Sequence, residues 1–197
     1  MYGKDRSGIP RSLRVNESGQ LSGVSNLTEA AINGRLFHTC SQASSTTSAT
    51  GTEAHVGLLV GNPPGSGKYL VMHEFGWAAD GEIADESTIG LATGAIGNMA
   101  LVAAPVIQPS LVGSAFSSVA YADQAGVTAG TLTIARICAE ADDDGAGGSQ
   151  YGSSGPNIYN INGSIVLAPG YVVGTDSELA LGDVMWFHFQ WEEIDII

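Results

Sequence analysis

The chain has 197 residues and a formal net charge of −13, yet only 14% of its residues are charged and 27 are Gly. This length suits one substantial domain, and two full domains would be cramped. The negative charge argues against a nucleic-acid binder, because such proteins take most of their affinity from clustered Lys and Arg. A surface rich in small, uncharged residues is typical of proteins that pack against neighbours.

The first 34 residues differ from the rest and predict an extended N-terminal arm. Most of the basic residues of the chain fall at its start: Lys4, Arg6, Arg11, Arg14 and Arg35. A basic arm on an acidic body is suited to reach an acidic neighbour, although a solvated tail would have the same composition. We expect no secretory signal, because no apolar run follows the basic residues at the start of the chain. We expect no membrane helix, because no apolar run reaches the length that a membrane span needs.

From residue 35 onward the pattern predicts closely spaced strands. Apolar runs at 35–40, 53–60 and 68–77 are separated by turns rich in Ser and Thr or in Gly and Pro. In the run at 68–77, strict alternation would place five side chains on one face: Tyr69, Val71, His73, Phe75 and Trp77. Both faces of this run are then largely covered, which predicts a central strand.

The middle of the chain, residues 84–130, holds no regular period for long. Gly recurs too often for a long helix, which leaves short helical turns open at 85–91 and 117–124. A clear strand pattern returns at 131–138. An acidic, Gly-rich stretch at 141–155 then predicts a surface loop.

The last strand gives the clearest pattern. Alternation places four apolar side chains on one face: Met185, Phe187, Phe189 and Trp191. The opposite face carries Trp186, His188, Gln190 and Glu192. About eight strands and no long helix predict an all-β fold, a jelly-roll β-sandwich over residues 35–197 that follows the arm of residues 1–34. An immunoglobulin-like sandwich is the alternative.

The segment Gly61–Lys68 resembles a phosphate-binding loop only superficially. Asn62 stands where that motif needs Gly, and Tyr69 stands where it needs Ser or Thr for magnesium. A strand rather than a helix follows, so no helix N-terminus is available for phosphate. We therefore expect a turn between antiparallel strands, with Gly supplying positive φ angles.

Four His residues fall in predicted strands: His38, His55, His73 and His188. Metal-binding cupin jelly rolls need two His one residue apart, and no such pair occurs. The nearest arrangement is His188 with Glu192 on one face, whereas Glu74 should point away from His73. We expect packed or interface His, no catalytic residue, no metal and no cofactor.

Two questions of ion binding and redox state stay open in the sequence. Asp142, Asp143 and Asp144 could bind calcium, but they lack the EF-hand order and indicate a solvated acidic loop. Cys40 and Cys138 are expected to be buried thiols, because both lie in apolar runs. Their spacing does not exclude a disulfide.

Three segments together carry a resemblance to a known class of proteins. They are the start, with Tyr2-Gly-Lys-Asp5 and Leu13–Leu21; the loop Gly61–Lys68 with its aromatic strand; and Gly163–Gly170 leading to Phe187–Glu193. In this combination the chain resembles small jelly-roll virion proteins of tailed bacteriophages, which decorate or cement the capsid or form head fibres.

The resemblance implies a non-enzymatic homotrimer on the capsid surface that contacts the major capsid protein. The arm would supply the capsid contact, with Arg6, Arg11 and Arg14 as candidates. The polar face of the last strand would supply the subunit interface, with Trp186, His188 and Gln190 as candidates. A phage tail or fibre component is an alternative. Another is a carbohydrate-binding jelly roll with exposed aromatic residues: Tyr69, Trp77, Tyr171 and Trp186.

Overall fold

The computed structural model of the protein describes residues 2–4, 10–12, 26–42, 54–79, 87–96, 106–128, 132–141, 157–177 and 185–196. The elements in chain order are β1 (Tyr2–Lys4), β2 (Pro10–Ser12), α1 (Asn26–Ile32), β3 (Leu36–Cys40), β4 (Ala54–Gly61), β5 (Lys68–Ala79), β6 (Ser87–Ala95), β7 (Ile107–Pro109), β8 (Tyr121–Thr128), β9 (Thr133–Ala141), β10 (Asn157–Leu167), β11 (Tyr171–Ser177) and β12 (Met185–Asp195). The all-β prediction is confirmed.

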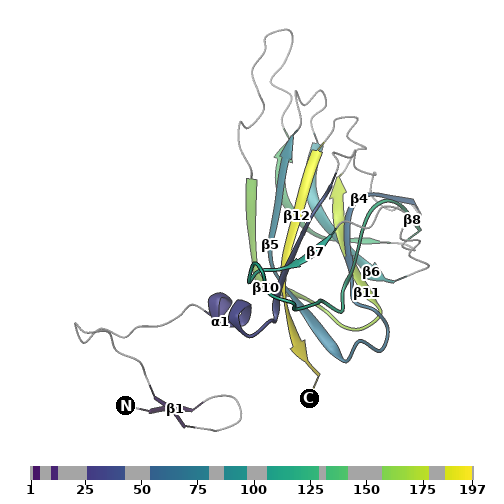
Figure 1. Ribbon diagram of the computed structural model, residues 1–197. Helices are drawn as coiled ribbons and strands as arrows, with labels where there is room; N and C mark the ends of the chain where they lie inside the picture. Colours follow the sequence, from purple (N-terminus) through teal and green to yellow (C-terminus); the bar gives the residue numbers. More distant parts are fainter. Residues whose placement is uncertain are drawn as a thin grey trace.

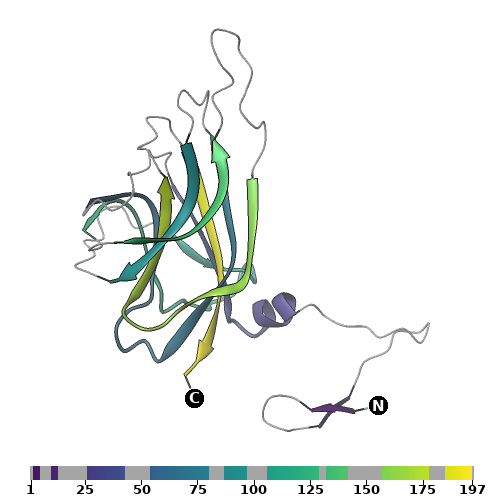
Figure 2. The ribbon, with the colours of Figure 1, turned by 180° about the vertical axis from the view of Figure 1, so that it is seen from behind.

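Two five-stranded antiparallel sheets form a sandwich (Figures 1 and 2). One has the order β10-β5-β12-β3-β7 and is called here the β12 sheet. The other has the order β8-β4-β11-β6-β9 and is called the β11 sheet. β12 and β11 each lie at the centre of their sheet, which agrees with the apolar patterns of both strands.

The connectivity is that of a jelly roll. Four strand pairs are nested like the two arms of one long folded hairpin: β3 with β12, β4 with β11, β5 with β10, and β6 with β9. Among the strands that the structure describes from β3 onward, no two consecutive strands pair with each other. An immunoglobulin-like sandwich would contain such consecutive pairs, so the jelly-roll prediction is confirmed over its alternative.

Two further strands extend the eight-stranded framework. β7 and β8 both lie between β6 and β9 in the chain, and each adds an edge strand to a different sheet, β7 beside β3 and β8 beside β4. Within the described residues, the short helical turns left open at 85–91 and 117–124 are not formed, because 87–91 lie in β6 and the second segment leads into β8. Pairing with a neighbouring strand outweighs the weak local preferences of these Ala- and Gly-rich segments.

The core lies between the sheets and is one contiguous cluster. The β12 sheet contributes its largest members: Phe37, Phe75, Trp77, Phe187, Phe189 and Trp191. Phe75 packs against two rings of β12, with centroids 6.2 Å away at Phe187 and 5.2 Å away at Phe189. The four residues predicted to fill the core from the last strand are all buried, so that prediction is confirmed.

The segment before β3 contains α1, so the predicted arm is not extended throughout. Ala30 of α1 is fully buried. The helix ends at Ile32 and is capped at Gly34, whose φ is +70°. The amide of Arg35 bonds to the carbonyl of Ala30, which completes a Schellman motif. A Cβ atom on Gly34 would lie 2.5 Å from the Phe116 ring, so this turn also needs Gly for space. In Figure 1, β1 and β2 lie beyond α1, away from the sandwich.

Candidate functional site

The outer face of the β12 sheet, opposite the core, holds the residues that the sequence singled out. We call this surface the β12 face. Trp186, His188 and Gln190 all lie on it, as the alternation predicted, and the Trp186 side chain is 40% exposed. Their use as a subunit interface stays a prediction.

His188 and Glu74 form a direct polar contact on the β12 face. Nε2 of His188 lies 2.7 Å from Oε1 of Glu74, a hydrogen-bond distance. The imidazole ring lies over Gly76, where a Cβ atom would come within 2.1 Å of two ring atoms. Only Gly leaves this space, so Gly76 positions the His188 ring against Glu74.

A β-bulge in β5 explains why this pair was missed in the sequence. The register shifts so that Gln190 lies opposite Glu74 and Trp191 lies opposite Met72, which leaves His73 as the extra residue. After the bulge, the side chains that strict alternation would place on one face of β5 therefore lie on the other face. As a result, both His73 and Glu74 reach the outer side of the sheet. The predicted face of β5 was wrong from this point on, because Phe75 and Trp77 join Leu70 and Met72 in the core.

Glu192 is the second carboxylate of the β12 face, and it also has partners. The Arg35 guanidinium donates a hydrogen bond to it, and Nε2 of His73 lies 3.6 Å from its other oxygen. His188 and Glu192 share the outer face, as predicted, but each contacts a residue of β5: His188 contacts Glu74, and His73 contacts Glu192. Each carboxylate thus faces a basic group.

A row of polar residues crosses all five strands of the β12 face. Register pairs connect Gln108, His38, Gln190, Glu74 and Asn160 in that order. Nδ1 of His38 lies 3.3 Å from the Ser110 hydroxyl. Burial, and then the nearby His188, lower the pKa of His38 below its ordinary value, which favours its neutral form.

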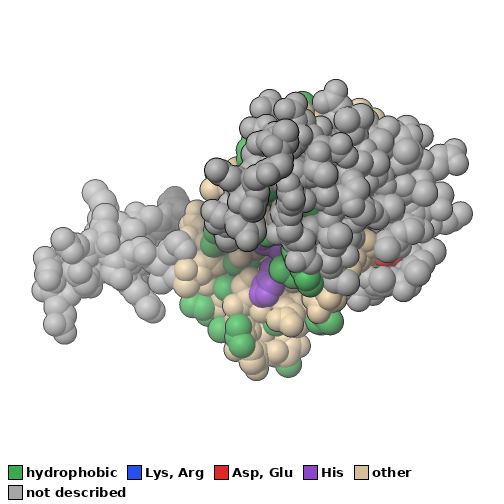
Figure 3. All heavy atoms as spheres, turned by 90° about the horizontal axis from the view of Figure 1, so that it is seen from above, with side chains coloured by type: hydrophobic (Ala, Val, Ile, Leu, Met, Phe, Trp, Pro, Cys, Tyr) green, Lys and Arg blue, Asp and Glu red, His purple; other side chains and the backbone are tan. Residues whose placement is uncertain are grey.

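Exposed apolar side chains surround this polar row. Besides Trp186, the β12 face exposes Ile158 and Val166 of β10 and Tyr69 of β5. Histidine also reaches the surface among hydrophobic and uncharged side chains in the view of Figure 3. Apolar and aromatic residues mixed with hydrogen-bonded polar groups are a composition found at protein interfaces.

The three arm residues proposed to contact a capsid are not brought to one site within the described residues. Arg6 and Arg14 lie outside the described residues. Arg11 lies in β2, where its backbone pairs with Gly3 of β1. Their role as capsid contacts stays a prediction.

The segment Gly61–Lys68 is a structural loop built around Asn62. The buried Asn62 amide donates hydrogen bonds to the carbonyls of Lys68 and Leu167, at 2.8 and 2.9 Å, and accepts one from the Ser66 hydroxyl. Gly65 and Gly67 have positive φ, as predicted. The loop does not form a hairpin, however, because it carries the chain from β4 in one sheet to β5 in the other.

Glu193 is a buried carboxylate that the sequence reasoning missed. Its Oε1 atom accepts hydrogen bonds from the Ser118 hydroxyl and the Val119 amide, and Nζ of Lys68 lies 3.6 Å from Oε2. These contacts fix the segment between β7 and β8 against the last strand. The alternation of β12 places Glu193 on the core face, and an acidic residue at such a position was the available signal.

The other candidate sites are partly outside the described residues. Asp142, Asp143 and Asp144 lie outside them, as does the side chain of His55. Among the residues that the structure describes, no group of three or more His, Cys, Asp or Glu side chains is arranged to hold a metal ion.

The two cysteines are not joined, and they differ in environment. Both are free thiols, and Cys138 packs against the core while Cys40 is exposed on the β12 face. The expected burial of Cys40 is wrong, because its position in β3 faces outward. Burial raises the pKa of Cys138 to about 11.

The four aromatic residues proposed for carbohydrate binding do not form one platform. Trp77 is buried in the core. Tyr69 and Trp186 lie at opposite ends of the paired strands β5 and β12, and Tyr171 begins β11 in the other sheet.

Comparisons with known proteins add no relative. No family model, curated protein or solved structure matches the chain. Within the described residues, the protein has no helix with the length and apolar character needed to cross a membrane.

Proposed function

We propose that this protein is a non-enzymatic virion structural protein, a trimeric decoration (cement) protein that binds the shell of the major capsid protein in a tailed bacteriophage. The sequence resemblance and the jelly-roll connectivity support this proposal. The observation that carries it is the composition of the β12 face, which suits contact between copies of the chain.

Electrostatics explain why the β12 face suits self-association. Copies of a chain with a net charge of −13 repel each other unless the surfaces brought together are nearly neutral. On the β12 face, the Arg35 guanidinium compensates the charge of Glu192, and Glu74 is hydrogen-bonded to His188. Trp186 and its apolar neighbours supply exposed hydrophobic area for packing.

The N-terminal arm supplies the contact with the shell in this proposal. Lys4, Arg6, Arg11 and Arg14 concentrate positive charge at one end of an acidic protein. An extended basic segment can reach an acidic surface without bringing the acidic body close to it. Such contacts weaken as the salt concentration rises.

The first experiment measures the oligomeric state of the purified protein by size-exclusion chromatography with light scattering. We expect a trimer that Trp186→Glu converts to a monomer, because a charge would be buried without a partner. Tyr121→Glu is the matched control, since Tyr121 is similarly exposed but lies in the β11 sheet. A monomeric wild-type protein would contradict the proposal.

The second experiment measures cosedimentation with mature, DNA-filled capsids and with isolated tails of the phage that carries the gene. We expect binding to capsids, with weaker binding after deletion of residues 1–20 and no loss of trimer. Unchanged binding would move the attachment site to the sandwich. Binding to tails alone would instead favour a tail or fibre component, and binding to neither would contradict a virion role.

A further inference from the structure

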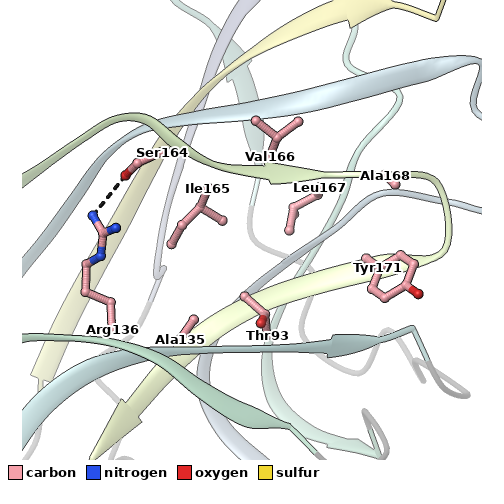
Figure 4. Close-up of a pocket in the computed structure, with 9 residues that line it drawn as sticks. All are labelled: Thr93, Ala135, Arg136, Ser164, Ile165, Val166, Leu167, Ala168 and Tyr171. Carbon is pink, nitrogen blue, oxygen red and sulfur yellow. Dashed lines mark hydrogen bonds between the residues drawn. The ribbon is translucent and has the colours of Figure 1, made fainter.

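A cleft of about 580 Å³ opens between the edge of the β12 sheet and the β11 sheet. Figure 4 shows Arg136 of β9 at one end and Tyr171 of β11 at the other. Ile165 and Leu167 project into it from β10 (Figure 4). This volume lies within the range of about 300–1,000 Å³ that is usual for small-molecule sites.

Arg136 differs from the other basic side chains that the structure describes. Arg35 and Lys68 are each paired with a carboxylate, whereas no carboxylate of the described residues lies within ion-pair distance of Arg136. Its Nη1 atom donates to the Ser164 hydroxyl at 2.9 Å, and its guanidinium lies 6.0 Å from the centre of the Tyr159 ring. These contacts hold the side chain in place and leave most of its N–H donors for another group.

The lining of the cleft is suited to an anion. Among the described residues, none of the side chains that line it is acidic. An Arg guanidinium offers two parallel N–H donors, which match the two oxygens of a carboxylate. The cleft therefore favours a ligand that carries a carboxylate.

We propose that this cleft binds an acidic saccharide, with a uronic-acid carboxylate at Arg136 and a sugar ring against Tyr171. The Tyr171 side chain is 51% exposed, which leaves ring surface for stacking. Thr93 supplies a hydroxyl group for the polar edge of a sugar, and Leu167 supplies apolar surface for its C–H face. The inference does not rest on the capsid role, because neither Arg136 nor Tyr171 belongs to the β12 face.

The shape of β10 disfavours an extended peptide in the same place. A bound peptide strand would need a regular edge of backbone N–H and C=O groups. β10 is interrupted at Asn162 and Gly163, whose φ angles are +51° and +74°, and its register with β5 shifts between Asn160 and Ile165. A bulged edge of this kind prevents continuous strand pairing.

Isothermal titration of the full-length protein with trigalacturonic acid tests the proposal. The matched ligand is its methyl ester, which keeps the sugar rings and removes the charges. We expect trigalacturonic acid to bind and Arg136→Gln to weaken binding at least about tenfold, because a charge-assisted pair is lost. The ester should bind more weakly by a similar factor, and Tyr171→Ala should also reduce affinity.

Two controls keep the result interpretable. Arg35→Gln makes the same change in net charge at a residue that does not line the cleft, and it should bind trigalacturonic acid like the wild type. Thermal unfolding of each variant verifies that it is folded, and Arg136→Lys, which keeps the charge, should bind with intermediate affinity. The proposal is overturned by absent binding, by equal binding of the ester, by equal loss in Arg35→Gln, or by tighter binding of a triglutamate peptide.

Discussion

The two sheets of the sandwich contribute different side chains to the shared core. The inward side chains of the β12 sheet are mostly aromatic, with Phe75 between two rings of the neighbouring strand. The β11 sheet supplies smaller aliphatic side chains: Leu58, Val60, Ile89, Leu91 and Val173. Large rings on one side and branched aliphatic residues on the other can interdigitate at the density of protein interiors.

The outer faces of the two sheets differ even more. The outer side of the β11 sheet carries a second buried apolar cluster, formed by Leu59, Ala92, Leu132 and Val172. The β12 face instead carries paired charges and exposed apolar side chains. The chain therefore buries apolar residues on both sides of the β11 sheet by itself, whereas the β12 sheet keeps one side suited to a partner.

The largest expected effect comes from removing an aromatic side chain of the β12 sheet. We expect Phe75→Ala to lower the free energy of unfolding by about 3–5 kcal/mol, because a cavity forms and two ring contacts are lost. Leu91→Ala in the β11 sheet should cost less, about 2–4 kcal/mol. Urea unfolding followed by tryptophan fluorescence measures both. Ile137→Ala, at an exposed position, is the control, and a smaller loss for Phe75→Ala than for Leu91→Ala would contradict the comparison.

A smaller effect is expected from Gly76→Ala on the β12 face. The new methyl group would collide with the His188 ring and displace it from Glu74, which should cost about 1–3 kcal/mol of stability. In a His188→Ala background, the same substitution should cost much less, because the ring is absent. Denaturant unfolding of the four proteins in this cycle gives the coupling, and equal costs in both backgrounds would disprove the clash.

The pH dependence of the free energy of unfolding should reveal the protonation of His38. Because the folded protein lowers the pKa of His38, its contribution to stability is complete above the ordinary value of 6.5 and is lost as the pH falls through the lowered pKa. We expect the difference in unfolding free energy between wild type and His38→Gln to shift in this direction between pH 8 and pH 5. A difference that does not vary with pH would show that His38 does not contribute in this way.

The two cysteines should react with thiol reagents at different rates. At pH 8, only about one Cys138 thiol in a thousand is ionised, since its pKa is about 11, and it also packs against the core. Cys40 is exposed on the β12 face and should react first with a disulfide reagent such as DTNB. In Cys40→Ser, only the slow phase should remain. A fast phase in that variant would place Cys138 at the surface.

Local sequence rules worked best where a strand is regular. Strict alternation in β12 placed all four core residues and all three proposed interface residues on the correct faces. In β5 the same rule failed after His73, because one extra residue in a bulge reverses the direction of every later side chain. The amino-acid sequence of residues 68–77 does not predict this bulge, since the bulge depends on pairing with β12 and β10.

The candidate site likewise has one part that the sequence predicted and one part that it did not. The composition of the β12 face could be read in part from β12 alone, through Trp186, His188 and Gln190. The pairs of His188 with Glu74 and His73 with Glu192 could not, because their members are more than one hundred residues apart in the chain. The cleft at Arg136 also joins separate strands from both sheets.

Residue patterns along the chain were enough to predict the fold class, the central aromatic strand and the loop nature of Gly61–Lys68, because alternation, Gly and Pro act on the local backbone. The order of the strands, the bulge in β5 and the pairing of each His with its carboxylate could not be predicted in this way. These features depend on side chains brought together by the nested pairing of distant strands. Short-range patterns carry no information about such pairing, since many registers bury the same apolar residues.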